Sequence, residues 1–256
     1  MSPRLDGTGI VITRPRQAAE ALAAELVQVG ARPFVFPALA IEDLPWSRHI
    51  EATLASLAQA TWAVFVSANA VEKGLAAARR AGTWPAHVRV AAVGEATAEA
   101  LRAEGIRDVL APHERHDSEG LLALAPLQDV AGQRVVIFRG EGGRERLREG
   151  LQGRGATVAY VECYRRVRPE ADPAPLLRAW SRGEIHAVSI LSGETLENFV
   201  AMIGGEGERL AAGTPLFVPH EAVGRHVQAR RFARVVVTGH GTPALVNALA
   251  ALKSVA

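Results

Sequence analysis

The residues of this 256-residue chain that could do chemistry gather where its predicted strands end. In open α/β sheets, ligands bind beyond the carboxyl ends of the strands, so these residues are the first candidates for a site. Hydroxyls, backbone N–H groups at helix starts and guanidinium groups are the groups that hold anions. The candidates contain no cluster of acids and no metal-binding set, and they are Thr13, Arg14, Ser67, Ala68, Asn69, Gly94, Arg139, Gly140, Ser192, Gly193, Pro219, His220, Thr238 and Gly239. The set predicts anion binding rather than bond cleavage by a pair of acids.

The stretch AAVGEATAEAL (91–101) has the pattern of a strand end, one glycine and a helix start. It resembles a phosphate-binding turn, but it lacks the further glycines of a dinucleotide site and the lysine of a nucleoside-triphosphate loop. Thr97 would lie in the first turn of the helix. Glu95 would place a negative charge at the positive end of that helix, which opposes an anion there.

Each candidate also has a purely structural explanation. Ser67 and Ser192 are good N-cap residues for the helices that follow them. Arg14 and Arg139 could be surface arginines, although their matched positions after strands favour a role in a site. Tyr164 is one of only two tyrosines and follows a strand beside a proline-rich segment, so it faces a cleft or packs in a hinge.

Nucleophile and metal sites are less well supported. Cys163 lies within a strand pattern with no base beside it, which is typical of a buried structural cysteine. Ser192 in ILSGETL lacks the glycine-serine elbow of hydrolases. His113 and His116 have no third metal ligand nearby, so no metal site is predicted. The stretch EGGRERLREG (141–150) is predicted to be a solvated helix face.

Strand-like runs alternate with helical patterns along the chain, which predicts an α/β fold with parallel sheets. In the first helix, Ala18, Leu22, Leu26 and Val29 form an apolar stripe that Gly30 ends, and Pro15 occupies the first turn. Poor apolar/polar alternation in the strands indicates burial on both faces. The predicted strands are 9–15, 31–37, 62–67, 88–94, 134–140, 157–164, 186–192, 214–219 and 233–239.

A shift of 125 residues aligns much of the chain with itself. Arg14 then falls on Arg139, and Ser67 on Ser192, while the strand–helix units keep their order. We infer two related α/β halves. Prolines at 37 and 45, and at 169, 173 and 175, are the best linker candidates. These positions do not distinguish two sequential domains from an arrangement in which one domain is discontinuous.

Composition restricts the class of protein. A net charge of +2 gives no support for a nucleic-acid partner, and no apolar run is long enough to span a membrane. The amino-terminal sequence lacks a signal-peptide pattern, and a single cysteine excludes an internal disulfide. Together these features predict a cytoplasmic protein.

The motifs, in this order and spacing, resemble the uroporphyrinogen-III synthase family of tetrapyrrole biosynthesis over essentially the whole chain. They are VITRP (11–15), VFVSANAVE (64–72), AVGEATAEAL (92–101), SEGLLALA (118–125), RGEGGRERLREGLQGRGA (139–156), YR (164–165) and GTPAL (241–245).

The resemblance implies two α/β domains joined by two crossing linker strands, with the active site in the cleft between them. One domain would comprise residues 1–36 plus 170–256, the other residues 42–163, and the linkers residues 37–41 and 164–169. Hinge motion is the default expectation for so slender a connection. The family further implies a cofactor-free monomer, with transient contact with neighbouring pathway enzymes left open.

The substrate implied by the resemblance is hydroxymethylbilane, a linear tetrapyrrole with eight carboxylates, which is cyclised with loss of water and inversion of ring D. Tyr164 matches the family's cleft tyrosine and would assist departure of the hydroxyl group. The resemblance also implies a set of ligands for the substrate carboxylates. Arg14 is assigned to it from its place after a strand, and the other residues are assigned from the family's motifs. The full set is Arg14, Ser67, Gly94, Thr97, Ser118, Arg139, Ser192, Gly193 and Thr242.

One segment departs from the family. Where a glycine-and-threonine turn is usual, this chain has FVPHEAVGRHV (217–227), so Pro219 removes an N–H group and Glu221 adds a negative charge. Either the domain that contains this segment contributes less to binding, or the chain is a divergent member with altered substrate handling. Two alternative functions are considered beside the resemblance. One is a non-catalytic two-domain protein that closes on a small anion, and the other is a nucleotide-using α/β enzyme.

Overall fold

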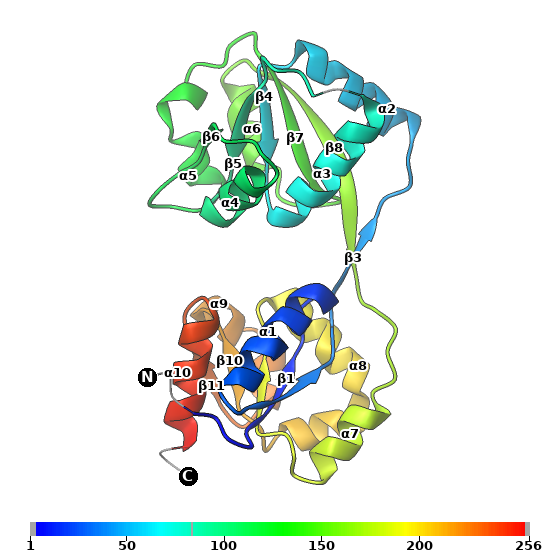
Figure 1. Ribbon diagram of the computed structural model, residues 1–256, viewed down its shortest axis with the longest axis vertical. Coiled ribbons are helices and arrows are strands. Elements are labelled where there is room, and N and C mark those ends of the chain that lie inside the picture. The colour runs from blue at the N-terminus through cyan, green and yellow to red at the C-terminus, as the bar shows by residue number, and fades with distance from the viewer. Residues whose placement is uncertain (1–3, 83, 254–256) are drawn as a thin grey trace. The chain divides into compact units, whose positions relative to one another are not determined.

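The chain folds into two α/β units, each built on its own sheet (Figure 1). The computed structural model describes residues 4–82 and 84–253. Unit 1 comprises residues 1–40 and 167–256, and unit 2 comprises residues 41–166. Each unit has its own apolar core.

The sheet of unit 2 has six strands, of which five pair in parallel. The residues of the central strand β4 are all buried, as its unbroken apolar sequence WAVF predicts. The strands lie in the order β3 (Ala40–Asp43), β8 (Thr157–Val167), β7 (Arg134–Gly140), β4 (Trp62–Phe65), β5 (Arg89–Ala92) and β6 (Val109–Leu110).

Alternate residues of these strands supply two core layers in unit 2, because successive strand side chains point to opposite faces. Phe65 and Phe138 pack under α2 (Arg48–Ala55), α3 (Ala68–Ala81), α4 (Glu95–Ala103) and the short 3₁₀ helix η1 (Ser56–Gln59). Val64 and Ile137 pack under α5 (Ser118–Leu122), α6 (Arg146–Gly153) and η2 (Ala125–Leu127) on the other face.

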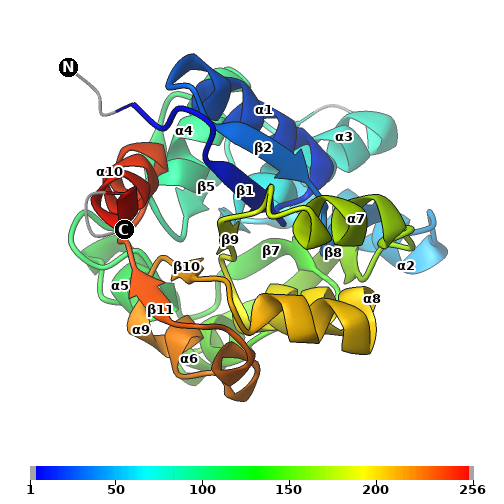
Figure 2. The same ribbon diagram turned by 90° about the horizontal axis from the view of Figure 1, so that it is seen from below.

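The sheet of unit 1 has five parallel strands in the order β2 (Arg32–Val35), β1 (Gly9–Ile12), β9 (Ala187–Ser189), β10 (Leu216–Val218) and β11 (Val235–Val237). Helices α1 (Arg16–Gln28) and α10 (Thr242–Lys253) cover one face. The opposite face packs against α7 (Ala174–Ser181), α8 (Gly193–Ala211), α9 (Glu221–Gly224) and η3 (Val227–Arg231), as Figure 2 shows for α7 and α8.

The two sheets repeat the same strand order, in agreement with the internal repeat. The sequence β2-β1-β9-β10-β11 corresponds to β8-β7-β4-β5-β6. The registers match as well, because the pair Gly9↔Arg32 recurs 125 positions later as Arg134↔Thr157. Leaving out the edge strand β3, each sheet takes two strands from one half of the sequence and three from the other. The repeats therefore exchange strands rather than folding separately.

Several predicted elements differ in length from the observed ones. Most strands end earlier because the chain leaves the sheet to start a helix; β9 stops at Ser189, and Ser192 caps α8. Strand β8 instead continues through Tyr164 to Val167, so Tyr164 lies within a strand rather than at its end. In α1 the buried residue is Ala19, not Ala18, and Pro15 is the N-cap rather than a first-turn residue.

The stretch predicted as a solvated helix face also differs. Residues 141–145 form a loop, and α6 begins only at Arg146. The reason is the glycine pair: Gly142 has φ 61° and Gly143 has φ 156°, values that lie outside a right-handed helix. Over the described ranges, no helix is both long enough and apolar enough to cross a membrane.

Candidate active site

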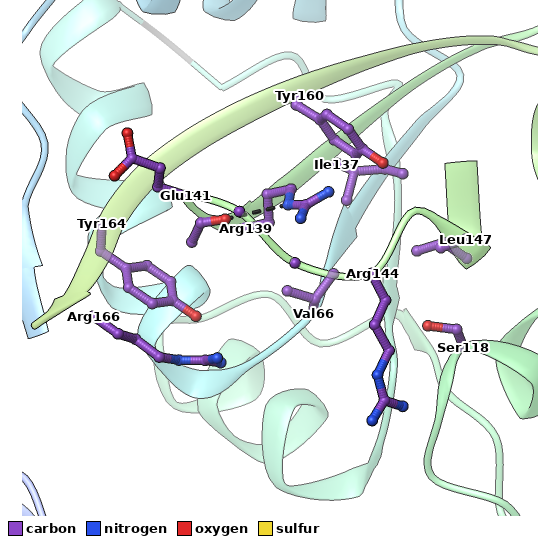
Figure 3. Close-up of a pocket in the computed structure, with 13 residues that line it drawn as sticks. Val66, Ser118, Ile137, Arg139, Glu141, Arg144, Leu147, Tyr160, Tyr164 and Arg166 are labelled. Atoms are coloured by element: carbon purple, nitrogen blue, oxygen red, sulfur yellow. Dashed lines mark hydrogen bonds between the residues drawn. The ribbon is translucent and has the colours of Figure 1, made fainter. Parts of the chain in front are cut away.

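A pocket of about 340 Å³ opens in unit 2 at the carboxyl ends of β4 and β7 (Figure 3). Three arginines, two tyrosines and a glycine-rich loop dominate its lining, and one acidic residue contributes to it. The lining residues are Val66, Ser118, Ile137, Arg139, Gly140, Glu141, Gly142, Gly143, Arg144, Leu147, Tyr160, Tyr164 and Arg166. The excess of guanidinium groups over carboxylates suits an anionic ligand.

Tyr164 lines this pocket although its side chain is only 1 % exposed. Its hydroxyl lies 3.0 Å from Oγ of Ser67, which is the N-cap of α3 and accepts a hydrogen bond from the Ala70 amide. Ser67 therefore fulfils the structural role of a cap and also holds the tyrosine hydroxyl. The two predicted residues come from β8 and the start of α3, and the tertiary structure brings them together.

A β-bulge aims Tyr164 at Ser67. Strands β7 and β8 pair regularly up to Arg139↔Glu162, and the next pair is Gly140↔Tyr164, which leaves Cys163 as an extra residue. Without the bulge, Tyr164 would share a face with Tyr160 and Glu162, because strand side chains alternate. The extra residue turns Tyr164 toward the opposite, α3-covered face, where it packs with the core.

Gly140 provides the space that the Tyr164 ring occupies. A Cβ atom at this glycine would lie 2.6 Å from Cε2 and 2.8 Å from Cζ of the ring. Glycine is therefore required at position 140 because the Tyr164 ring lies too close to the backbone for any side chain to fit.

We expect Gly140→Ala to lower kcat by up to about 10²-fold, since small displacements of a reacting group have effects of that size. The added methyl group must push the Tyr164 ring away from Ser67. Gly153→Ala is the matched control, because a Cβ atom there meets nothing within 4 Å. Steady-state kinetics of both variants test the expectation, and an unaltered kcat in Gly140→Ala contradicts it.

Arg139 is buried and bonded within its own unit. Its side chain is 6 % exposed, and its Nη1 donates to the Glu145 carboxylate at 2.9 Å. Its Nε donates to the carbonyl of Gly140, and the guanidinium lies 4.4 Å from the centre of the Tyr160 ring. The predicted carboxylate ligand Arg139 is thus already paired with a carboxylate of the protein.

Glu145 and Tyr160 complete this network. The Tyr160 hydroxyl donates to Glu145 at 2.9 Å. That hydrogen bond, followed by the bond from Arg139, holds the pKa of Glu145 below its ordinary value. Burial, followed by the bond to Glu145, raises the pKa of Tyr160 to about 12, so Tyr160 remains a neutral donor at physiological pH.

Glu145→Gln is expected to lower the melting temperature at neutral pH, because it removes the nearer of the two carboxylates that the described residues place beside the buried Arg139 and leaves Glu162, at 3.9 Å. A carboxyl group whose pKa is lower in the folded state stabilises the fold at pH values above its pKa in the unfolded chain, which is the ordinary 4.5. This contribution disappears as the pH falls through the lower folded-state value. The difference between wild type and variant should therefore shrink as the pH falls below 4.5.

Thermal unfolding followed by circular dichroism at several pH values measures this difference. Glu149→Gln on the exposed side of α6 is the control and should leave the curve unchanged. A difference that is independent of pH would contradict the assigned role of Glu145.

The lining residues with a cationic or aromatic side chain that were absent from the sequence-based candidates are Arg144, Tyr160 and Arg166. In Figure 3 the side chain of Arg144 extends toward Ser118, and that of Arg166 lies below the hydroxyl of Tyr164. The glycine pair before Arg144 was the available signal, since it predicts a loop at a strand end. Arg166 lay in a segment interpreted only as a linker.

Ser118, Gly94 and Thr97 complete the predicted set of unit 2. Ser118 lines the pocket as the first residue of α5, which Asp117 caps. Gly94 is the N-cap of α4, with extended backbone, and a Cβ atom there would lie 3.0 Å from Cβ of His116. Thr97 is buried within α4. Gly94 and Thr97 are outside the lining of this pocket.

The four predicted residues of unit 1 do not gather in one pocket. Arg14 lines a smaller pocket of about 190 Å³ at the carboxyl ends of β1, β9, β10 and β11. Ser192 caps α8 by accepting from the Thr195 amide, and a Cβ atom at Gly193 would lie 2.9 Å from the His226 ring. Thr242 is the first residue of α10. The last three are outside the lining of that smaller pocket.

The two acidic residues that opposed anion binding are both engaged in ion pairs. Glu95 accepts from Arg102 at 2.5 Å, and this bond is the main cause that lowers its pKa. Glu221, the first residue of α9, pairs at 2.7 Å with Arg225, which is the C-cap of the same helix. Each carboxylate is therefore neutralised by an arginine close to it in the sequence.

The described residues contain no group of three or more His, Cys, Asp or Glu side chains placed to hold a metal ion. Cys163 is buried, and its Sγ lies 3.3 Å from the Arg139 carbonyl. Burial raises the pKa of its thiol to about 12, so it is no nucleophile at neutral pH. The groups that the unit 2 pocket presents are guanidinium groups, which can bind an anion, and the hydroxyl of Tyr164.

Comparison with known proteins places these features in one family. The family model described as uroporphyrinogen-III synthase HemD matches residues 20–247. The uroporphyrinogen-III synthase of Salmonella typhimurium is 38 % identical over 192 residues, which are 73 % of this chain and 77 % of that protein. That of Escherichia coli K12 is 33 % identical over 76 % of this chain and 79 % of its own length.

The fold agrees with this assignment. A crystal structure of a mutant uroporphyrinogen III synthase from the extremely thermophilic bacterium Thermus thermophilus superposes with a TM-score of 0.62, at 20 % identity, over 96 % of this chain and 99 % of that one. The family model covers residues 20–247, and the shared fold covers 96 % of the chain. The chain belongs to the uroporphyrinogen-III synthase family.

Proposed function

We propose that the protein is a uroporphyrinogen-III synthase, a lyase that cyclises hydroxymethylbilane with loss of water and inversion of ring D. The observation that carries the proposal is the unit 2 pocket, where the Tyr164 hydroxyl, bonded to Ser67, lies among arginines. The family match supplies the substrate class, a tetrapyrrole of porphyrin biosynthesis.

The pocket suits the charge of such a substrate. Arg144 and Arg166 present guanidinium groups from the glycine-rich loop and from the end of β8. Guanidinium forks bind carboxylates in a bidentate manner, which fixes orientation as well as position. Holding a flexible chain in one conformation is itself a large part of catalysis, because it removes the entropy cost of reaching the reactive geometry.

Tyr164 is proposed to donate the proton that accompanies loss of the hydroxyl group. The C–O bond breaks, the departing oxygen takes the phenolic proton, and water leaves an electrophilic azafulvene. Ser67 can support this step, since it accepts from the Ala70 amide and can donate its own proton to the Tyr164 oxygen. The tyrosine proton is then free to point toward the substrate.

The later steps need positioning more than further acids or bases. Ring D attacks the electrophilic azafulvene through its own substituted carbon to give a spiro intermediate, which fragments and recloses with ring D inverted. A proton lost from the last intermediate restores the tyrosine, so the overall loss is one water molecule. We propose that the chain performs this reaction as a monomer and without a cofactor.

The decisive experiment supplies hydroxymethylbilane to the purified protein and separates the porphyrinogen isomers formed. The type III isomer should dominate, at a rate well above spontaneous closure. Formation of only the symmetric isomer at the spontaneous rate would refute the proposal.

A further inference from the structure

The internal repeat places Arg14 and Arg139 at equivalent positions, each close after the matching segments of β1 and β7. Their surroundings differ completely. Arg139 is bonded to Glu145 and lies over Tyr160, so its charge is compensated within the protein. The Arg139 guanidinium is therefore engaged at Nη1, at Nε and against the Tyr160 ring.

Arg14 lacks this compensation. The residue equivalent to Glu145 is Glu20, which is exposed and pairs with Arg16 at 3.3 Å. The Nε of Arg14 is fully buried and has no hydrogen-bond partner within the described residues. Burial, only partly opposed by the charge of Glu25, lowers the pKa of Arg14. A buried donor without a partner is unfavourable, and an anion that binds there would satisfy it.

The smaller pocket of unit 1 surrounds Arg14 with further donors. His240 lies in a turn between Gly239 (φ 84°) and Gly241 (φ 88°), which carries its side chain to the pocket. The ring of His220 packs edge-on against that of His240, with centroids 5.6 Å apart. Pro219, which also lines the pocket, has no N–H to donate. Among the described lining residues, His240 is the one side chain besides Arg14 that carries nitrogen, and His220 lies outside the lining.

The charges of the pocket lining favour an anion, and Glu25, whose charge acts on Arg14, lies outside that lining. Glu221, the acidic residue that follows His220, is paired with Arg225. Among the described residues, those that line the pocket include no Asp or Glu, and the rest of the lining is apolar or hydroxyl-bearing. A volume of about 190 Å³ accommodates one small anionic group rather than a whole tetrapyrrole.

We propose that Arg14 and His240 bind one side-chain carboxylate of the substrate in this pocket, and that Arg139 is a positioning residue that holds the loop 140–145. The proposal rests on the proposed function. It adds His240 to the binding residues and separates the roles of the two repeat-related arginines. A free inorganic anion offers the same chemistry as the carboxylate, so the experiment must distinguish the two.

Steady-state kinetics with hydroxymethylbilane provide the first test. Arg14→Gln and His240→Ala should each raise KM about tenfold or more while kcat changes little, the size expected for one lost charge-assisted hydrogen bond. Arg16→Ala is the matched control: this arginine is exposed at the start of α1, outside the pocket, and its substitution should leave KM unchanged.

Thermal unfolding gives a readout that separates binding from structure. Arg14→Gln should leave the melting temperature unchanged or raise it, because it removes a buried donor without a partner. Arg139→Gln should lower it, because Glu145 and Tyr160 lose their partner. A lower melting temperature in Arg14→Gln would overturn the binding assignment in favour of a structural one.

Inorganic phosphate distinguishes the source of the anion. If the pocket binds a substrate carboxylate, phosphate should compete weakly with the substrate in the wild type, and this competition should be lost in Arg14→Gln together with the rise in KM. Phosphate binding that disappears in Arg14→Gln without any change in KM would show a site for a free anion only, and would overturn the proposal. Failure of the wild type to form the type III isomer is a different result, and it would refute the proposed function instead.

Discussion

Tyr164→Phe is expected to lower kcat by about 10²–10⁴-fold, the range of single acid–base groups. The substitution removes the hydroxyl that lies 3.0 Å from Ser67 and leaves the buried ring in place. Residual turnover then comes from positioning alone. Because spontaneous closure gives the symmetric isomer, the type III fraction of the product should fall along with the rate.

Tyr160→Phe is the informative comparison, since it deletes the only other tyrosine hydroxyl of the chain. That hydroxyl is bonded to Glu145, so its loss should weaken the Arg139 network and affect stability more than kcat. Single-turnover kinetics with isomer analysis measure both variants. An unchanged rate in Tyr164→Phe would remove this residue from the mechanism.

Phe138→Ala is expected to destabilise unit 2 by about 3–5 kcal/mol, the usual cost of deleting a buried phenylalanine ring. Phe138 is fully buried, and its ring stacks on Phe65 at 4.5 Å with an interplanar angle of 6°. Gly74 of α3 leaves room for it, since a Cβ atom there would lie 2.6 Å from the ring. The cavity left by alanine cannot collapse without moving β7, which carries Arg139.

Chemical denaturation measures this loss, with Phe138→Leu as the control that retains most of the volume and should cost less than about 1.5 kcal/mol. Because the chain has two units, unfolding must be followed by a probe within unit 2, such as the fluorescence of Trp62 or Trp84. A loss below about 1 kcal/mol in Phe138→Ala would show that this layer is not a close-packed core.

The chemistry of the site could be predicted where it depends on local pattern. The hydroxyl after β4 and the arginine near the end of β7 follow from strand ends, and Ser67 caps α3 as its position predicts. Local pattern did not predict Arg144, because the charged run 141–150 is typical of a solvated helix whereas its glycine pair folds the first part into a loop. Local pattern did not predict the burial of Arg139 either. Its partner Glu145 lies across a turn, and the shape of that turn depends on Gly142 and Gly143.

The orientation of Tyr164 shows why such features cannot be predicted from the sequence. Alternation along β8 places Tyr164 with Tyr160, whereas the bulge opposite Gly140 moves it to the other face. A bulge arises from the pairing of two strands, so neither strand predicts it alone. The hydrogen bond between Tyr164 and Ser67 exists only because of that shift.

The sequence by itself determined the α/β class, the buried strands and the internal repeat, because apolar runs and turn residues act over a few positions. It could not determine which strands pair. Strands β4 and β9 are equivalent in the repeat, so β1 could have joined either in the same register, yet it joins β9. That choice is made by packing between distant segments, whose free energy belongs to the whole core and not to any one stretch. The same packing gave Arg139 a carboxylate partner and left the Nε of Arg14 without one among the residues that the structure describes.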